Sequence, residues 1–231
     1  MNSRQETFNY MKFTITVKWA VVVLVCAGVL AIHGNTAATK ENDPEKIVAR
    51  VEKTLQNMKT LSCSFKQVYY RKVTDSTVSL SGMFFLKKPY LLRMENQNQT
   101  VVVDGSLVWL YVPRNNQVQI SDFVPTEKDF PTPLSLFERY SGSGSIGFYG
   151  EEDLNDSTCA VLTIDSDEPG KNRVTVWIDR HLHFPVKTVE ESPNGDTVRY
   201  LLKEVKLNEA IIDSVFTFTV PEGVEVIDLR E

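Results

Sequence analysis

The stretch from Gly82 to Val112 constrains the fold more than any other part of the chain. Lys87-Lys88-Pro89 and Asp104-Gly105 interrupt it with residues that end strands or form tight hairpin turns. Between the turns lie four segments of strand length, rich in β-branched and aromatic residues that suit a pleated sheet. They are Met83–Leu86, Tyr90–Met94, Val101–Val103 and Leu107–Val112. The sequence therefore predicts a meander of antiparallel strands.

The last of these segments is apolar toward both faces of the predicted sheet. A sheet with one face in water alternates apolar and polar residues, whereas Leu107–Val112 offers apolar side chains to both faces. A second sheet, a helix or a bound apolar ligand must then cover the second face. Which of the three applies decides most of the functional question.

The amino terminus has the pattern of a secretory signal peptide. Lys12 and Lys18 precede an apolar run, Trp19–Ile32, of 14 residues, and small residues follow it at 36–38. The run is shorter than the roughly 20 residues that span a bilayer. We therefore expect residues 1–37 to be a signal peptide, with Met1 or Met11 as the start. A retained membrane anchor is the alternative.

The predicted mature chain, residues 38–231, is acidic and long enough for one sizeable core. It carries 22 bases and 29 acids, a net charge of −7, which disfavours nucleic acid as a partner. Its two cysteines, Cys63 and Cys159, would be exported to a compartment that permits disulfides. Their spacing does not say whether they pair.

Two helices are predicted outside the strands. Asp43-Pro44-Glu45 is typical of a helix start, and Ile47, Val48, Val51, Leu55 and Met58 follow with helical spacing. Its apolar face could pack permanently on the core or form part of a removable cover. Between prolines and a Gly/Ser tract, residues 133–140 predict a short apolar helix that is either a lid or a fixed cap.

Sequence patterns for catalysis or metal binding are absent. The chain has no Gly-x-Ser-x-Gly motif, and its Gly/Ser tract lacks the Lys-Ser/Thr ending of a phosphate-binding loop. His181 and His183 have no nearby cysteine or further histidine to complete a metal site. The sequence thus predicts no enzyme and no cofactor, although carboxylates can meet in space without a sequence signal.

Several segments, in order and spacing, resemble one family, the periplasmic outer-membrane lipoprotein carriers known as LolA. The similarity extends from about residue 41 to residue 228, and no single motif carries it. The motifs are Gly82-x-Phe84-x-Leu86-Lys-Lys-Pro89, Leu92-Arg93-x-Glu95, Val103-Asp-Gly105-x-x-x-Trp109-x-Tyr111, Pro133-Leu134 and Phe216-Thr-Phe218-x-x-Pro221-x-Gly-Val224-Glu-Val226.

The resemblance implies a mainly β (α+β) fold. It would be a curved, incomplete antiparallel barrel of about eleven strands, with helices closing the concave apolar face. It also implies a periplasmic, monomeric chaperone without enzymatic activity. Such a chaperone takes acylated lipoproteins from an ATP-driven inner-membrane release complex and delivers them to an outer-membrane receptor. Residues 38–231 would then be a lipoprotein-carrier domain.

The resemblance also places an acyl-chain cavity and a latch for the lid. Many relatives have Lys-Arg-Pro where this chain has Lys87-Lys88-Pro89, so Lys88 would hold the lid, with Arg93 as the second candidate. A slip of one residue in a strand would exchange every inward side chain for its neighbours. The expected cavity residues are Phe85, Leu92, Met94, Val101, Val103, Trp109 and Tyr111 from the sheet, Val51 and Leu55 from the first helix, and Leu134, Leu136 and Phe137 from the lid.

Two other functions remain compatible with the sequence. One is a periplasmic carrier or sensor for a different amphiphile, such as a glycolipid, built on the same curved sheet. The other is a secreted enzyme whose site has no recognisable motif. Identification of the molecules that copurify with the protein would separate the two carriers, and turnover of a substrate would reveal an enzyme.

Overall fold

A computed structural model describes residues 41–125, 145–165, 170 and 172–230. The predicted signal peptide and the predicted lid helix, including Leu134, Leu136 and Phe137, lie outside these residues. The described residues belong to one compact unit that extends from Thr36 to Glu231.

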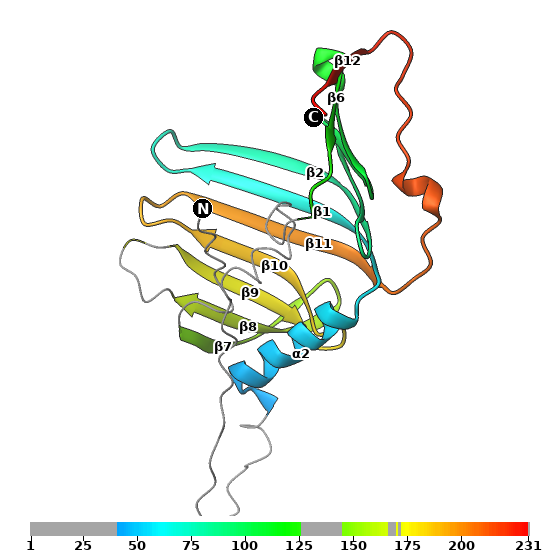
Figure 1. Ribbon diagram of the computed structural model, residues 1–231. Helices are drawn as coiled ribbons and strands as arrows, with labels where there is room; N and C mark the ends of the chain where they lie inside the picture. Colours follow the sequence, from blue (N-terminus) through cyan, green and yellow to red (C-terminus); the bar gives the residue numbers. More distant parts are fainter. Residues whose placement is uncertain (1–40, 126–144, 166–169, 171, 231) are drawn as a thin grey trace, which may run out of the picture. The chain divides into compact units, whose positions relative to one another are not determined.

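The described chain forms one helix and one sheet of twelve strands (Figure 1). The helix is α2, Pro44–Asn57, and two short 3-10 turns are η1, Pro113–Asn115, and η2, Asp213–Phe216. The strands are β1 Thr60–Arg71, β2 Ser76–Lys87, β3 Leu91–Asn96, β4 Thr100–Asp104, β5 Leu107–Val112, β6 Gln117–Asp122, β7 Ser145–Leu154, β8 Ser157–Asp165, β9 Arg173–Asp179, β10 Phe184–Glu191, β11 Thr197–Leu207 and β12 Glu225–Asp228.

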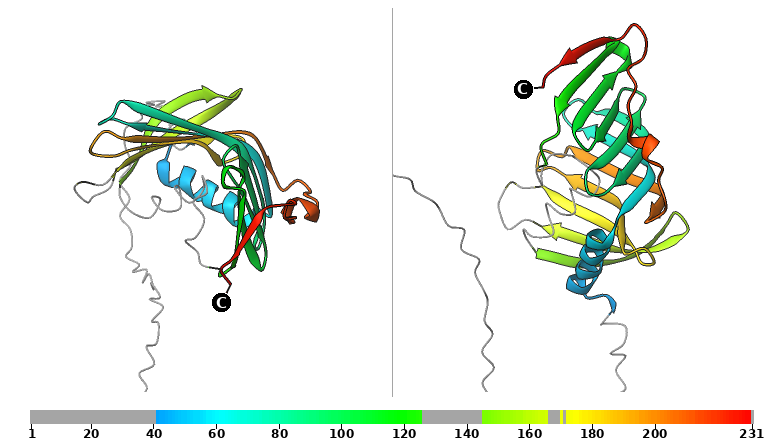
Figure 2. Two further views of the ribbon diagram at one scale, coloured as in Figure 1. Left: turned by 90° about the horizontal axis from the view of Figure 1, so that it is seen from above. Right: turned by 45° about the vertical axis from the view of Figure 1, so that its right-hand side comes forward.

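The strand order is β12-β6-β5-β4-β3-β2-β1-β11-β10-β9-β8-β7, so the two edge strands do not pair and the barrel is incomplete. All neighbours are antiparallel except β12, which adds to β6 in parallel. The sheet curves around α2, which lies on its concave side (Figure 2). The predicted curved, mainly β architecture is confirmed, with one strand more than expected and one parallel pair.

Local sequence explains the first helix and the central hairpin. The Asp43 side chain accepts a hydrogen bond from the backbone N–H of Glu45 at 3.2 Å, and Pro44 occupies the first turn of α2. In the β4–β5 turn, Asp104 Oδ1 accepts from the backbone N–H groups of Ser106 and Leu107 at 3.0 and 2.8 Å. Gly105 adopts a φ of 97°, which glycine reaches without strain.

The core lies between α2 and the concave face. Ile47, Val48, Val51 and Leu55 of α2 are buried in one cluster with apolar side chains from both halves of the sheet. Within the residues that the structure describes, no helix has the length and apolar character needed to cross a bilayer.

Candidate functional site

Two rows of apolar side chains cross strands β2 to β5 on the concave face. The register pairs Leu86 with Leu92 and Leu92 with Val103, and β5 continues this row with Val108. The parallel row consists of Phe84, Met94, Val101 and Leu110. Phe84, Leu92 and Val103 are buried, whereas Leu86, Met94, Val101, Val108 and Leu110 stay partly exposed among the described residues.

Six of the predicted cavity residues come together in this region. Leu92 and Val103 are buried in the same cluster as Val51 and Leu55 of α2, and Met94 and Val101 pack against that cluster. Helix α2 therefore covers part of the concave face. Since α2 is the only helix among the described residues, closure of the face by several helices remains a prediction.

Phe85, Trp109 and Tyr111 lie on the opposite, convex face, which corrects their predicted position. Val101 pairs with Leu110 and Val103 pairs with Val108, so the alternate residues Trp109 and Tyr111 point away from the concave face. Likewise, the pairing of Phe84 with Met94 directs Phe85 to the convex side, opposite Arg93. The hydrophobicity of the β5 sequence could not predict which of its side chains point to the concave face, because both of its faces are apolar.

The carboxyl-terminal segment packs on part of the convex face. The ring of Phe218 lies 5.8 Å from that of Trp109 and 5.9 Å from that of Tyr111, and the Trp109 indole donates to Asp104 Oδ2 at 2.9 Å. Phe216 in η2 is only 2% exposed. The Phe218 ring therefore packs against the convex aromatic residues of β5, although Trp109 and Tyr111 stay partly exposed, as Val108 and Leu110 do on the concave face. We take the concave rows beside α2 as the candidate ligand site.

Arg93 holds this segment, not a lid over the cavity. Its guanidinium donates to the backbone carbonyls of Val215 and Thr217, each at 3.1 Å, and forms an ion pair with Glu95. These contacts place the predicted second latch on the convex face. Arg93 therefore stabilises the carboxyl-terminal segment.

Lys88 reaches the helix that covers the concave face. Its Nζ donates to the backbone carbonyl of Leu55 at 2.7 Å, in the last turn of α2. That turn contains no basic residue of its own, so Lys88 supplies the positive charge that a helix carboxyl terminus favours. Contact of Lys88 with the segment 133–140 stays a prediction, because that segment lies outside the described residues.

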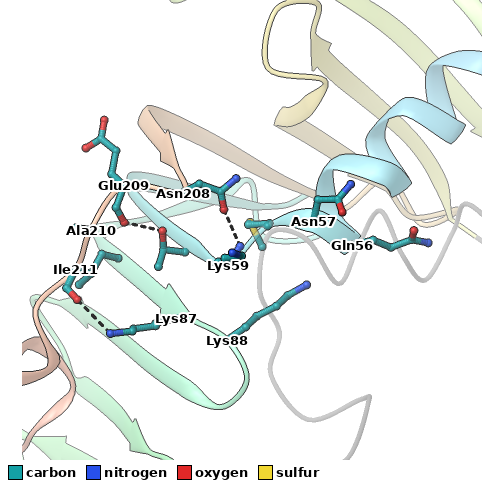
Figure 3. Close-up of a pocket in the computed structure, with 11 residues that line it drawn as sticks. Gln56, Asn57, Lys59, Lys87, Lys88, Asn208, Glu209, Ala210 and Ile211 are labelled. Carbon is teal, nitrogen blue, oxygen red and sulfur yellow. Dashed lines mark hydrogen bonds between the residues drawn. The ribbon is translucent and has the colours of Figure 1, made fainter.

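Neighbouring Lys87 points the other way. Its Nζ contacts Asp213 Oδ1 at 2.5 Å and the Ile211 carbonyl at 3.4 Å, whereas Lys88 extends toward the end of α2 (Figure 3). The two lysines border a pocket of about 660 Å³ between the end of α2 and residues 208–211. The turn after β2 thus ties the sheet both to the helix and to the carboxyl-terminal segment.

We expect Lys88→Leu to loosen α2 without unfolding the sheet. The lost charged hydrogen bond should lower the free energy of local opening of the last helical turn by about 1.5–3 kcal/mol. Hydrogen exchange of the amides at 54–58 measures this opening. Lys87→Leu is the matched control and should accelerate exchange near residues 211–217 instead. Equal exchange at 54–58 in Lys88→Leu and the unmodified protein would exclude the latch.

The two cysteines are free and buried. The β1–β2 register puts Cys63 on the concave side with Phe84, and the β8–β9 register puts Cys159 on the other face, opposite Asp179. Burial raises the pKa of the Cys63 thiol to about 12. Burial and nearby carboxylates, Asp179 first among them, raise the pKa of Cys159 to about 11. Both residues therefore behave as small apolar side chains at neutral pH.

His181 and His183 occupy the turn between β9 and β10. In the described part of the chain, no three His, Cys, Asp or Glu side chains form a group that could hold a metal ion.

The concave rows also contain residues that were not among the predicted lining: Phe84, Leu86, Val108 and Leu110. The two-residue Gly105-Ser106 loop carried the signal for Val108 and Leu110, since it fixes the pairing of β4 with β5.

The fold and this face define a class of proteins in which one open antiparallel sheet curves around an apolar face. The crystal structure of an uncharacterized conserved protein from Thermus thermophilus matches with a TM-score of 0.52 and 17% identity. The match covers 80% of this chain and 98% of that one. At this identity it shows a shared fold and no more.

The sequence places the chain within a family. A protein-family model described as "Outer membrane lipoprotein carrier protein LolA" matches residues 56–219 of the sequence. The chain therefore belongs to the LolA family. An outer-membrane lipoprotein carrier protein of Histophilus somni (strain 2336) is 28% identical over 192 residues, 80% of this chain and 88% of that one. An uncharacterized protein of Methanocaldococcus jannaschii is 22% identical over 194 residues, which are 81% of this chain but 55% of the relative.

Proposed function

We propose that this protein is a periplasmic carrier that binds the acyl chains of lipoproteins on its concave face. It receives them from an ATP-driven release complex of the inner membrane and delivers them to an outer-membrane receptor. In this proposal residues 1–37 are a signal peptide, residues 38–231 are the carrier domain, and the carrier acts as a monomer without catalysing a reaction. Family membership and the H. somni relative support the proposal.

The observation that carries the proposal is the partly exposed apolar surface beside α2. Leu86, Met94, Val101, Val108 and Leu110 lie on one face, while the carboxyl-terminal segment packs on part of the other face of the same strands. Each methylene that leaves water contributes about 0.8 kcal/mol, so a few acyl chains on such a surface would bind strongly. A latch from Lys88 to α2 would let the cover open and close.

The apolar rows would select acyl chains but not a headgroup, because burial of apolar surface is not directional. A carrier or sensor for another amphiphile, such as a glycolipid, therefore remains the second candidate. Mass spectrometry of molecules that copurify with the periplasmic protein separates the two. If the protein carries lipoproteins, we expect them to copurify with it. We also expect lipoproteins to stay in the inner membrane when the protein is depleted.

A pair of methionines on opposite faces tests the binding face. Met94 lies on the concave face and Met83 on the convex face, where it is 37% exposed. Met94→Gln would bury an amide without a partner against the acyl chain, which costs about 1–2 kcal/mol and weakens binding roughly tenfold. Displacement of a hydrophobic dye by a triacylated lipopeptide measures the affinity. We expect Met83→Gln to leave it unchanged, and equal loss in both variants would refute the assigned face.

A further inference from the structure

A second pocket, of about 530 Å³, lies between α2 and the β9–β10 turn. Arg50, Lys53, Thr54 and Asn57 line it from one stripe of the helix, since residues three and four apart share a face. The remaining lining residues are His181, Leu182, His183, Leu207 and Asn208. Two permanent cations and two imidazoles therefore surround this pocket, and no carboxylate lines it.

The cations of this pocket differ from the lysines of the neighbouring pocket. Lys87 contacts Asp213, and Lys88 donates to the Leu55 carbonyl. Among the residues that the structure describes, Arg50 and Lys53 have no carboxylate within ion-pair distance. The second pocket is thus lined by two cations that form no ion pair with a described carboxylate, in a domain whose net charge is −7.

The charges around His183 are also mainly positive. Burial lowers the pKa of His183, the Arg50 guanidinium lowers it further, and His181 and Arg180 act in the same direction. Asp179 opposes them, but its carboxylate is buried and accepts hydrogen bonds from the backbone N–H groups of His181 and Leu182 at 2.8 Å each. From α2 the charged residues lining the pocket are Arg50 and Lys53, and the end of β11 contributes only the uncharged Leu207 and the residue after it, Asn208.

We propose that this pocket binds a phosphate group, as the free ion or as the headgroup of a phospholipid. Guanidinium, ammonium and imidazole N–H groups are the donors that phosphate oxygens favour, and the Arg50 guanidinium can donate two parallel hydrogen bonds. The volume lies within the range of small-ligand sites. The pocket uses α2 residues of the stripe outside the buried core, so this binding goes beyond the proposed acyl-chain function and does not depend on it.

The test is a titration of the full mature protein followed by the imidazole resonances of His181 and His183. The probes are inorganic phosphate, dihexanoylphosphatidylglycerol below its micelle concentration, and dihexanoylglycerol, which has no phosphate. We expect a phosphate-bearing probe to move both imidazoles and to raise the pKa of His183, because a bound anion favours the imidazolium. Dihexanoylglycerol should leave them unchanged.

Two variants with a matched control complete the test. Arg50→Gln and Lys53→Gln should each weaken binding about tenfold, as loss of a charged hydrogen bond does. Lys66→Gln removes the same charge from an exposed position on β1 and should have no effect. If Arg50→Gln and Lys53→Gln weaken the binding of inorganic phosphate, the ligand is the free ion. If they weaken only the binding of dihexanoylphosphatidylglycerol, the ligand is the phospholipid headgroup.

Two results would overturn the proposal. One is that no phosphate-bearing probe moves the imidazoles. The other is that binding is the same in Arg50→Gln, Lys53→Gln and Lys66→Gln. An equal response to dihexanoylglycerol would assign the shifts to acyl chains and would count equally against the phosphate site. Acyl-chain binding at the concave face is measured separately by dye displacement, so the failure of one proposal leaves the other standing.

Discussion

Leu92→Glu is expected to lower the free energy of unfolding by about 3–5 kcal/mol at neutral pH, because it places an unpaired carboxylate in the core. Leu92 is 6% exposed and lies between Leu86 and Val103 on the concave face, in the cluster that includes α2. Urea denaturation at several pH values measures the loss. Leu91→Glu is the control, since the side chain of Leu91 points to the other face and is partly exposed, and its loss should be much smaller.

The pH dependence identifies the cause of the loss. Burial raises the pKa of the introduced carboxyl above its value of about 4.3 in the unfolded chain. The folded state then binds the proton more tightly, so the stability lost at neutral pH is regained as pH falls through the folded-state pKa. The difference between variant and unmodified protein should be smallest near pH 4, at about the unfolded-state pKa. A gap that is the same at acid and neutral pH would show that the carboxyl escapes to solvent.

The same variant has a consequence for transport if the acyl-chain proposal holds. A charged group at 92 would disfavour both the closed cover and a bound acyl chain, because each would remove it from water. Cells that make Leu92→Glu beside the unmodified protein are expected to retain lipoproteins in the inner membrane. Normal delivery by the variant alone would remove Leu92 from the acyl-chain path.

Sequence predicted the elements well where local residues determine them. Asp43 and Pro44 start α2, and Asp104-Gly105 closes the β4–β5 hairpin, because caps and tight turns depend on residues a few positions apart. The four segments between Gly82 and Val112 all lie within strands β2 to β5, except Tyr90 in the turn. Family resemblance supplied the curvature and the incomplete barrel, for which the local pattern carried no signal.

Side-chain direction could be predicted less well. Where both faces of β5 are apolar, hydrophobicity does not distinguish Trp109 from Val108, and only the pairing with β4 does. The covering contacts join distant residues, such as Lys88 with Leu55 and Arg93 with Val215 and Thr217. No sequence pattern predicts these contacts, because a lysine that follows a strand, like Lys88, or an arginine within one, like Arg93, is compatible with many carbonyl partners. The second pocket, for which we propose phosphate binding, had no sequence signal either, because α2 and the β9–β10 turn are far apart in sequence.

The second large expected effect concerns the convex face. It distinguishes the carboxyl-terminal segment, which packs on that face, from the ligand-binding rows of the concave face. Phe216→Ala should remove about 3–5 kcal/mol of packing, since the ring is almost fully buried where η2 lies over β3 and β4. The carboxyl-terminal segment should then detach, although Arg93 still reaches toward its carbonyls. Limited proteolysis within residues 209–224 and greater acrylamide quenching of Trp109 would report the detachment. Phe218→Ala should act in the same direction but more weakly, because its ring is only partly buried.

Lipopeptide binding by Phe216→Ala is the decisive measurement. The segment lies on the convex face, so its release should leave the affinity of the concave rows within about twofold of the unmodified protein, less than about 0.5 kcal/mol. Met94→Gln should show the opposite pattern, with weaker binding and a protease-resistant carboxyl-terminal segment. Together the two variants distinguish a sheet with one covered and one binding face from a sheet that binds on both. If Phe216→Ala loses as much affinity as Met94→Gln, the segment itself contributes to the ligand site, and the convex aromatic residues return to the list of lining candidates.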